Sequence, residues 1–445
     1  MYVYNTLLTV FTLGLPRAYS YFLPRVSNSE AKSVIRKINS LFFILGGFFS
    51  LLLFFGAEYI ASFLNNSELG RALRIFSPVP FLMLPTMGLE AIMATYQKTH
   101  LLALYNIITR CVMLICVTYP IVFCNGGYIE AIYGFTTAAF ISFVIALYLK
   151  FLPVKHYATE PTTISYRSIF EFSLPLLYAS LWGMIIKSSD QFFISRYYGN
   201  EVFAEFSNGA MELPFIGMII GTCSTILSPI FSKLSHQQVD LKSELYPIWM
   251  NVFKKCTMLI YPILLFCCFF SDVLMGLLYG AKYESSYIYF CIISLTNFFT
   301  IIVFAPFLIN TGKVKLYANI HMLVAISIVL LEYISVKLHL SSYSIVAIST
   351  MCNIVKIFIM LHIISKMFGT RIIELFPIGT IVKIVIPSVA ILLISRYILA
   401  QFELNYLLTI LFGGVVYLSA FFVCSKVTKL DYISIIAPLF KKKGV

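Results

Sequence analysis

Four basic residues lie inside long hydrophobic stretches, where a charged side chain is expensive: Arg17, Arg110, Lys187 and Lys356. At the depth of a bilayer each cation costs about 2.5–3.5 kcal/mol, so four of them facing lipid would cost on the order of 10 kcal/mol. They must therefore face protein or water. Arginine presents a planar fork of donors that matches phosphate oxygens, and lysine adds a point charge. Cations at this depth favour an anionic ligand, most naturally a phosphate.

The stretch TLGLPRAYSYFLPR, residues 12–25, places two arginines beside a glycine and two prolines. Arg17 lies about two thirds of the way through its hydrophobic segment, and Arg25 lies at the end of it. Because a Gly-Leu-Pro sequence precedes Arg17 and no acidic residue is nearby, we expect a broken helix with Arg17 facing a cavity. Arg110 and Lys356 lie near the middle of their segments and could face either a cavity or an acidic partner. We predict that Arg17, Arg25, Arg110 and Lys356 bind the phosphate groups of a ligand.

Acidic residues could neutralise part of this charge. Lys187 and Asp190 are spaced i,i+3 in IIKSSDQFF, so they share a helix face and can pair locally. Glu205 and Glu212, seven residues apart, are expected on one face of the following segment, where they could serve another cation. Asp190, Glu205 and Glu212 are also candidate sites for a coupling proton or sodium ion.

Composition places all of these residues in a membrane protein. Hydrophobic residues make up 60% of the 445 and charged residues only 11%, against about 25% charged in soluble domains. The hydrophobic residues recur in blocks of about 20, the length that a helix needs to cross a bilayer. We predict an all-α polytopic protein with thirteen spans, at about 2–23, 40–64, 73–95, 100–123, 128–151, 170–194, 203–231, 250–272, 285–309, 314–336, 342–365, 377–398 and 405–425.

The net charge of +13 is a topology signal rather than a sign of nucleic-acid binding. Of the 32 Lys and Arg residues, 22 fall on one side of the predicted spans, Lys150 and the KKKGV tail among them, and six on the other. Positive residues mark the cytoplasmic side. A cytoplasmic C-terminus and thirteen spans would put the N-terminus outside, so we expect that an initial span is missing from this sequence.

The polar stretch 153–169 divides the sequence into halves. We expect an N-terminal lobe at 1–152, a cytoplasmic linker at 153–169, a C-terminal lobe at 170–368, and two extra helices with a basic tail at 369–445. Prolines inside spans of both halves fit helices that bend around a central cavity.

The sequence favours transport over enzymatic chemistry. The ten cysteines and six histidines are scattered, with no CxxC and no spacing suited to zinc, so no metal site is predicted. No nucleophile–base pair and no phosphate-binding glycine loop is visible, so no cofactor is predicted. The predicted external loops are too short for the large external loop expected of a membrane O-antigen polymerase.

Four motifs, in this order and spacing, carry a family resemblance: FTLGLPRAYSYFLPR, SSDQFFISRYYGNEVFAEFSNGAMELP, LLYGAKYESS and FLINTGKVKLYAN. The chain resembles the O-antigen-type flippases of the multidrug/oligosaccharidyl-lipid/polysaccharide exporter superfamily. The resemblance implies twelve to fourteen helices in two six-helix lobes. It matches Arg17 and Arg25 to basic positions of the second helix and Asp190 to the acidic position of the seventh. Gln191 stands where many relatives carry a basic residue.

The resemblance also implies a function. Such proteins move undecaprenyl-diphosphate-linked oligosaccharide, an O-antigen or capsule-type repeat unit, across the bacterial inner membrane by alternating access. The cavity cations would bind the diphosphate, membrane lipid would hold the polyprenyl tail, and a polymerase and chain-length proteins would be partners. A drug or cation antiporter of the same superfamily is the alternative. An antiporter cavity should favour carboxylates, whereas cations predominate in these spans.

Overall fold

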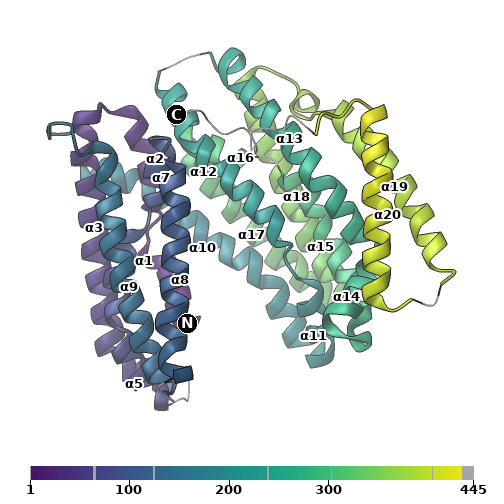
Figure 1. Ribbon diagram of the computed structural model, residues 1–445, viewed down its shortest axis with the longest axis horizontal. Helices are drawn as coiled ribbons and strands as arrows, with labels where there is room; N and C mark the ends of the chain where they lie inside the picture. Colours follow the sequence, from purple (N-terminus) through teal and green to yellow (C-terminus); the bar gives the residue numbers. More distant parts are fainter. Residues whose placement is uncertain are drawn as a thin grey trace. The chain divides into compact units, whose positions relative to one another are not determined.

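The hydrophobic blocks fold into helices, because a backbone in lipid must satisfy its own hydrogen bonds. The computed structural model describes residues 2–63, 67–123, 126–237, 240–301, 303–402 and 404–432, and over these ranges it contains helices and no strand (Figure 1). The predicted all-α class is confirmed. The basic tail at 441–443 lies outside the described residues.

Eleven of the described helical segments are long and apolar enough to cross a bilayer, and a twelfth is added if the bent pair Ala281–Thr300 and Phe304–Asn310 counts as one span. These segments correspond to twelve of the thirteen predicted spans. The remaining one, 2–23, forms two short helices, α1 (Tyr2–Phe11) and α2 (Pro16–Phe22), rather than one long helix.

The break between α1 and α2 follows from local geometry. Leu13 and Gly14 both have left-handed backbone angles, with φ of 47° and 69°. A Cβ on Gly14 would lie 2.7 Å from the Cβ of Leu176 and 2.9 Å from the carbonyl oxygen of Ser173, so only glycine allows this close approach. Pro16 then starts α2 at a position where proline is favoured. The broken helix expected at the Gly-Leu-Pro sequence is confirmed.

The described chain forms two compact units, and each is built from separate stretches of sequence. Unit 1 comprises Met1–Leu181, Thr225–Gln238 and Pro306–Ala318, and unit 2 comprises Trp182–Ser224, Val239–Ala305 and Asn319–Val445. The expected central cavity concerns the placement of two lobes and stays a prediction, as do the lobe boundaries.

Unit 1 contains most of the N-terminal helices, packed around a core that includes Tyr19, Phe42 and Phe49. Gly134 lets two of its long helices meet, since a Cβ there would collide with the carbonyl of Cys116. After α1 and α2 these elements are η1 (Leu23–Arg25), α3 (Asn28–Phe55), α4 (Ala57–Phe63), α5 (Ser67–Phe76), α6 (Pro78–Met83), η2 (Leu84–Thr86), α7 (Leu89–Thr95), α8 (Thr99–Phe123), α9 (Tyr128–Phe151) and η3 (Leu152–Val154).

The following helix, α10 (Tyr166–Tyr197), begins in unit 1 and ends in unit 2. The remaining elements are α11 (Gly199–Gly209), α12 (Pro214–His236), α13 (Leu241–Phe269), α14 (Ser271–Tyr279), η4 (Ala281–Ser286), α15 (Tyr287–Thr300), α16 (Phe304–Asn310), α17 (Val314–Lys337), α18 (Ser342–Phe368), η5 (Ile372–Leu375), α19 (Ile378–Leu399) and α20 (Tyr406–Val427).

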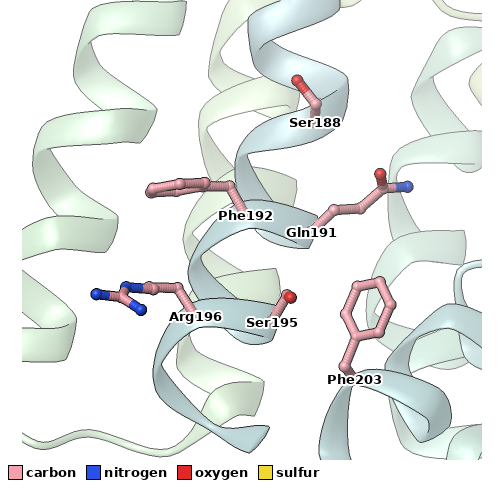
Figure 2. A pocket seen from close by; sticks show the side chains of 6 residues that line it. All are labelled: Ser188, Gln191, Phe192, Ser195, Arg196 and Phe203. Atoms are coloured by element: carbon pink, nitrogen blue, oxygen red, sulfur yellow. The ribbon is translucent and has the colours of Figure 1, made fainter. Parts of the chain in front are cut away.

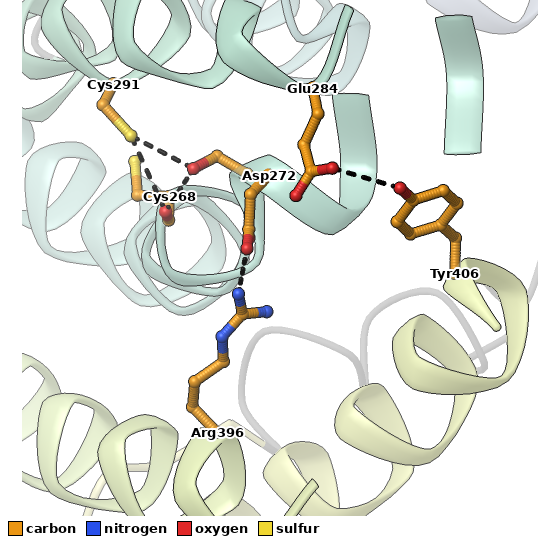
Figure 3. Close-up of polar contacts among 7 residues, drawn as sticks. Cys268, Asp272, Glu284, Cys291, Arg396 and Tyr406 are labelled. Atoms are coloured by element: carbon orange, nitrogen blue, oxygen red, sulfur yellow. Dashed lines mark hydrogen bonds and ion pairs between the residues drawn. The ribbon is translucent and has the colours of Figure 1, made fainter. Parts of the chain in front are cut away.

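Polar contacts attach the last two helices to the rest of unit 2 (Figure 3). Arg396 of α19 forms an ion pair with Asp272 of α14, and both side chains are only partly exposed. The Tyr406 hydroxyl of α20 donates to Glu284 at 3.1 Å, and its ring lies so close to Gly276 that a Cβ there would come within 2.6 Å. The two C-terminal helices are therefore fixed to α14 and η4 at one end.

Candidate functional site

A lysine that belongs to no acidic pair lies at the centre of unit 1. Lys150, near the end of α9, is fully buried. Its Nζ donates to the Met87 carbonyl at 2.6 Å, to Asn39 Oδ1 at 3.1 Å and to the Tyr19 hydroxyl at 3.3 Å. It also lies 4.8 Å from the centre of the Tyr19 ring and 5.4 Å from that of Phe42. Neutral acceptors and ring faces thus surround the cation, and no carboxylate of the described residues bonds to it.

Helix breaks supply this arrangement. Gly88, between η2 and α7, has a left-handed φ of 80°, and a Cβ there would collide with the Tyr19 ring. The interruption leaves the Met87 carbonyl outside a regular helix, free to accept from Lys150. The sequence interpretation counted Lys150 among the cytoplasmic basic residues. The side chain points into the protein rather than toward a membrane surface, and the side of the membrane on which it lies stays a prediction.

Arg25 is also held by protein groups. Its Nε donates to Ser232 Oγ at 2.9 Å and its Nη2 to the Asn310 carbonyl at 2.8 Å, while the guanidinium lies 3.6 Å from the centre of the Tyr21 ring. Ser232 Oγ in turn donates to the Tyr21 carbonyl at 2.6 Å. All of these residues belong to unit 1. Burial lowers the pKa of Arg25, but an arginine remains protonated.

Arg17 and Arg110 are exposed on the surface of unit 1. Arg17 lies in the first turn of α2, directly after the break, and Arg110 lies near the middle of α8, a helix without any buried residue. Within the described ranges neither arginine takes part in an ion pair, since the four pairs there are Arg74–Glu58, Arg167–Glu171, Lys187–Glu212 and Arg396–Asp272. Both guanidinium groups are therefore available to an anion.

Lys356 ends a polar stripe on α18. Its Nζ donates to Asn353 Oδ1 at 2.6 Å, Asn353 donates to the Ser349 carbonyl at 2.9 Å, and the Ser349 hydroxyl donates to Asp190 at 2.8 Å. The three α18 residues recur at helical spacing, so they follow one face toward α10. Lys356 is thus connected to Asp190 through neutral groups.

Asp190 lies close to Glu332 of α17, since the hydroxyl of the adjacent Ser189 donates to the Glu332 carboxyl group. Glu332 is fully buried and accepts a hydrogen bond from the hydroxyl of Ser189. Asp190 Oδ1 and Glu332 Oε1 are buried without any donor from the described residues. Two buried carboxyl groups near each other disfavour double ionisation, and a shared proton or a bound cation would neutralise the pair. This acid pair is the clearest candidate for cation exchange in unit 2.

The expectation that Glu212 serves a cation is confirmed, but the local pairing of Lys187 with Asp190 and the shared helix face of Glu205 and Glu212 were wrong. Lys187 does not pair with Asp190, which is turned inward, but with Glu212, at an Nζ–Oε1 distance of 2.6 Å. Glu205 and Glu212 do not share one helix face, because α11 ends at Gly209 and α12 starts only at Pro214. Glu212 lies in that connection, where it reaches Lys187, and Glu205 accepts from Ser285 at 3.0 Å.

The sequence model of the polysaccharide biosynthesis protein family matches residues 25–288, more than half of the chain. The chain belongs to this family. No curated protein shows a significant sequence match. The matched range includes Arg25, Arg110, Lys150 and Asp190, whereas Glu332 and Lys356 follow it.

Solved structures show which fold this family member adopts. A MOP superfamily transporter from Pyrococcus furiosus superposes with a TM-score of 0.66 at 14% identity, over 80% of this chain and 85% of that one. A MATE protein in its straight conformation gives 0.67 at 13% identity, over 82% and 88%. The Vibrio cholerae MATE transporter VcmN in its bent form gives 0.65 at 12%, over 83% and 87%. The expected exporter-superfamily fold is confirmed.

Two residues of the candidate sites were missed in the sequence. Glu332, in LLEYIS, lies within a predicted span, and the rule that singled out the membrane cations would have found it. Lys150 gave no such signal, because a lysine at the end of an apolar segment ordinarily extends to the membrane surface. Its acceptors come from α2, α3 and the η2–α7 connection, which no local pattern links.

Proposed function

We propose that this family member translocates undecaprenyl-diphosphate-linked oligosaccharide, an O-antigen or capsule-type repeat unit, from the cytoplasmic to the periplasmic leaflet of the bacterial inner membrane. The observation that carries the proposal is the set of cations predicted at membrane depth that form no ion pair among the described residues: Arg17, Arg110 and Lys356. Membership of the polysaccharide biosynthesis protein family supports it.

The physical task fits such residues. A diphosphate and its sugars must cross a layer that excludes both, while the polyprenyl tail can remain in lipid. Charge-assisted hydrogen bonds from exposed arginines lower the free-energy cost of moving the diphosphate, and no covalent bond is made or broken. Arg17 and Arg110 are assigned this role because their guanidinium groups are exposed. Arg25 and Lys150 donate to acceptors within the protein and serve mainly to shape unit 1.

Energy for directional transport would come from a cation gradient. The Asp190–Glu332 pair can take up and release one proton, or exchange it for another cation, as alternating access proceeds. Lys187, Glu205 and Glu212 are assigned to structural pairing instead, since each has a partner within unit 2. Transport by this route requires no cofactor and no enzymatic step.

The buried acid pair also favours a second candidate, a cation-coupled antiporter for drugs or other solutes. Such a protein would use the same exchange of cations but would place carboxylates rather than arginines at the substrate. The exposed Arg17 and Arg110 favour the lipid-linked oligosaccharide. The C-terminus is assigned to the cytoplasm, and a polymerase and chain-length proteins would use the exported repeat unit.

A cell-based assay tests the proposal. Arg17→Ala and Arg110→Ala should each abolish surface glycan while membrane insertion, measured by fractionation and immunoblotting, stays intact. Arg167→Ala is the matched control, because Arg167 is highly exposed and paired with Glu171. Full surface glycan in both test variants would overturn the proposal. Drug sensitivity of the deletion strain, with surface glycan unchanged, would support the antiporter.

A further inference from the structure

A polar pocket lies near the C-terminal end of α10 and is lined by none of the residues assigned above. It has a volume of about 510 Å³ and belongs entirely to unit 2. Figure 2 shows its six lining side chains, five from α10 and one from α11: Ser188, Gln191, Phe192, Ser195, Arg196 and Phe203. Its size falls in the range of small-molecule sites, about 300–1,000 Å³.

The chemistry of the lining is selective. The Gln191 amide and the Ser195 hydroxyl can donate and accept hydrogen bonds, and two phenylalanine rings offer flat apolar faces. The Ser188 hydroxyl donates to the Met184 carbonyl at 2.7 Å and can still accept. Arg196 is the one charged residue of the lining, and within the described ranges it forms no ion pair. A sugar ring matches this lining, because it carries hydroxyl groups at its edge and apolar C–H groups on its faces. A planar guanidinium group pairs best with a carboxylate or a phosphate.

The pocket is built on a helix turn that the protein holds firmly. On the opposite face of this turn, Ser189 donates to Glu332 and Asp190 accepts from Ser349 at 2.8 Å. Phe206, one turn after Phe203 on α11, packs edge-on against Tyr289 with ring centres 5.8 Å apart. Side chains on a fixed backbone are preorganised for a ligand, which reduces the entropic cost of binding.

We infer that this pocket is a subsite for an acidic sugar and its neighbour in the translocated glycan. Arg196 and Phe192, which point to one side of α10, would contact the carboxylate and the ring of the acidic sugar, and Gln191, Ser195 and Phe203, on the other side, would contact the neighbouring sugar (Figure 2). The inference rests on the proposed function and extends it to the class of glycan. Arg196 lies in the last turn of α10, and basic residues precede the other end of that helix. The positive-inside rule therefore places the subsite on the periplasmic side, where the glycan is released.

An anionic lipid headgroup is the competing ligand for an exposed arginine. A headgroup would satisfy Arg196, but it would leave the amide of Gln191 and the hydroxyl of Ser195 without a partner of matching shape. The lining therefore favours the sugar.

A binding measurement tests the subsite without relying on transport. The full chain in phosphatidylcholine nanodiscs is titrated with a glucuronate-containing tetrasaccharide and with a neutral glucose tetrasaccharide of equal length. The acidic probe should bind about tenfold or more tightly than the neutral one, since hydrogen bonds to a charged group are worth that factor. Arg196→Gln should remove this preference, and Phe203→Leu should weaken binding of both probes. Lys282→Gln, which removes a cation outside the pocket, should leave binding unchanged.

Equal binding of the two probes, or an unchanged preference in Arg196→Gln, would overturn the subsite. Loss of acidic-probe binding when phosphatidylglycerol is added to the discs would assign Arg196 to headgroups instead. Arg196→Lys keeps the positive charge but lacks the planar guanidinium group, so it should retain part of the preference for the acidic probe. This partial retention separates a binding defect from misfolding. This experiment measures binding rather than transport. Normal surface glycan in the Arg17 and Arg110 variants would therefore refute the proposed transport function without changing the binding preference at Arg196.

Discussion

The guanidinium of Arg25 donates a 2.8 Å hydrogen bond to the backbone carbonyl of Asn310, and this bond fastens η1 to the end of α16. The same guanidinium donates to Ser232 of α12, so one side chain joins three segments that are far apart in the sequence. Asn310 and Ser232 are both buried. Arg25 is therefore part of the framework of unit 1 as well as a basic residue of the second-helix motif.

Replacing Arg25 should destabilise the protein. Arg25→Ala removes two charge-assisted hydrogen bonds and leaves the Asn310 carbonyl buried without its donor, which should cost about 1.5–3 kcal/mol. Thermal unfolding of the purified protein in detergent measures the loss. Arg17→Ala is the control, because Arg17 is exposed, and it should leave the unfolding temperature unchanged. Equal unfolding temperatures for both variants would contradict the framework role of Arg25.

The buried lysine of unit 1 can be examined with a double-mutant cycle. Lys150→Met leaves Asn39 Oδ1 and the Met87 carbonyl without donors, and each unsatisfied buried group costs about 1–3 kcal/mol. Adding Asn39→Leu removes one of these acceptors, so the double variant should unfold at a higher temperature than Lys150→Met alone. Strictly additive effects of the two substitutions would mean that Lys150 and Asn39 do not interact energetically.

The acid pair should behave as a site that holds one shared proton. In Glu332→Gln the amide can still accept from Ser189 and donate to Asp190, so stability should change by less than about 1 kcal/mol. The infrared band of the protonated carboxyl group and the directional transport of glycan should both disappear. Glu205→Gln serves as the matched control and should keep both signals. An identical infrared spectrum for the wild type and Glu332→Gln would show that the pair binds no proton.

The Asp272–Arg396 ion pair should hold the two C-terminal helices in place. Asp272→Asn leaves the partly buried guanidinium of Arg396 without its anion, which should lower stability by about 1–3 kcal/mol. Limited proteolysis should then cleave the α19–α20 region faster. The exchanged double variant, Asp272→Arg with Arg396→Asp, should recover part of the resistance, and a double variant cleaved faster than either single variant would argue against a specific pair.

The Lys187–Glu212 ion pair should matter little for stability. Both side chains are largely exposed, at 74% and 78%, and exposed pairs contribute about 0–1 kcal/mol. Lys187→Ala and Glu212→Ala should each unfold within that margin of the wild type. A loss of several kcal/mol in either variant would indicate that the pair is shielded from water.

Local sequence was sufficient to predict the fold class and several boundaries. The predicted spans match the observed helices wherever an apolar block is uninterrupted, as in 100–123 and 128–151. The break before Arg17 was predicted from Gly14 and Pro16, since both residues act on their own backbone. The single span predicted at 203–231 was less accurate, because α11 ends at Gly209 and α12 starts only at Pro214, a break that the average hydropathy of the block does not reveal.

The sequence by itself determined the membrane-helical class, the helix break before Arg17, and the presence of cations within predicted spans. These properties depend on residues close together in the chain, through hydropathy and backbone geometry. Only the tertiary structure decided which polar group each charge meets: Lys150 the Met87 carbonyl, Asp190 the carboxyl of Glu332, and Lys187 the carboxylate of Glu212. Partners of this kind come from distant segments, and helix packing, rather than spacing along the chain, brings them within hydrogen-bonding distance.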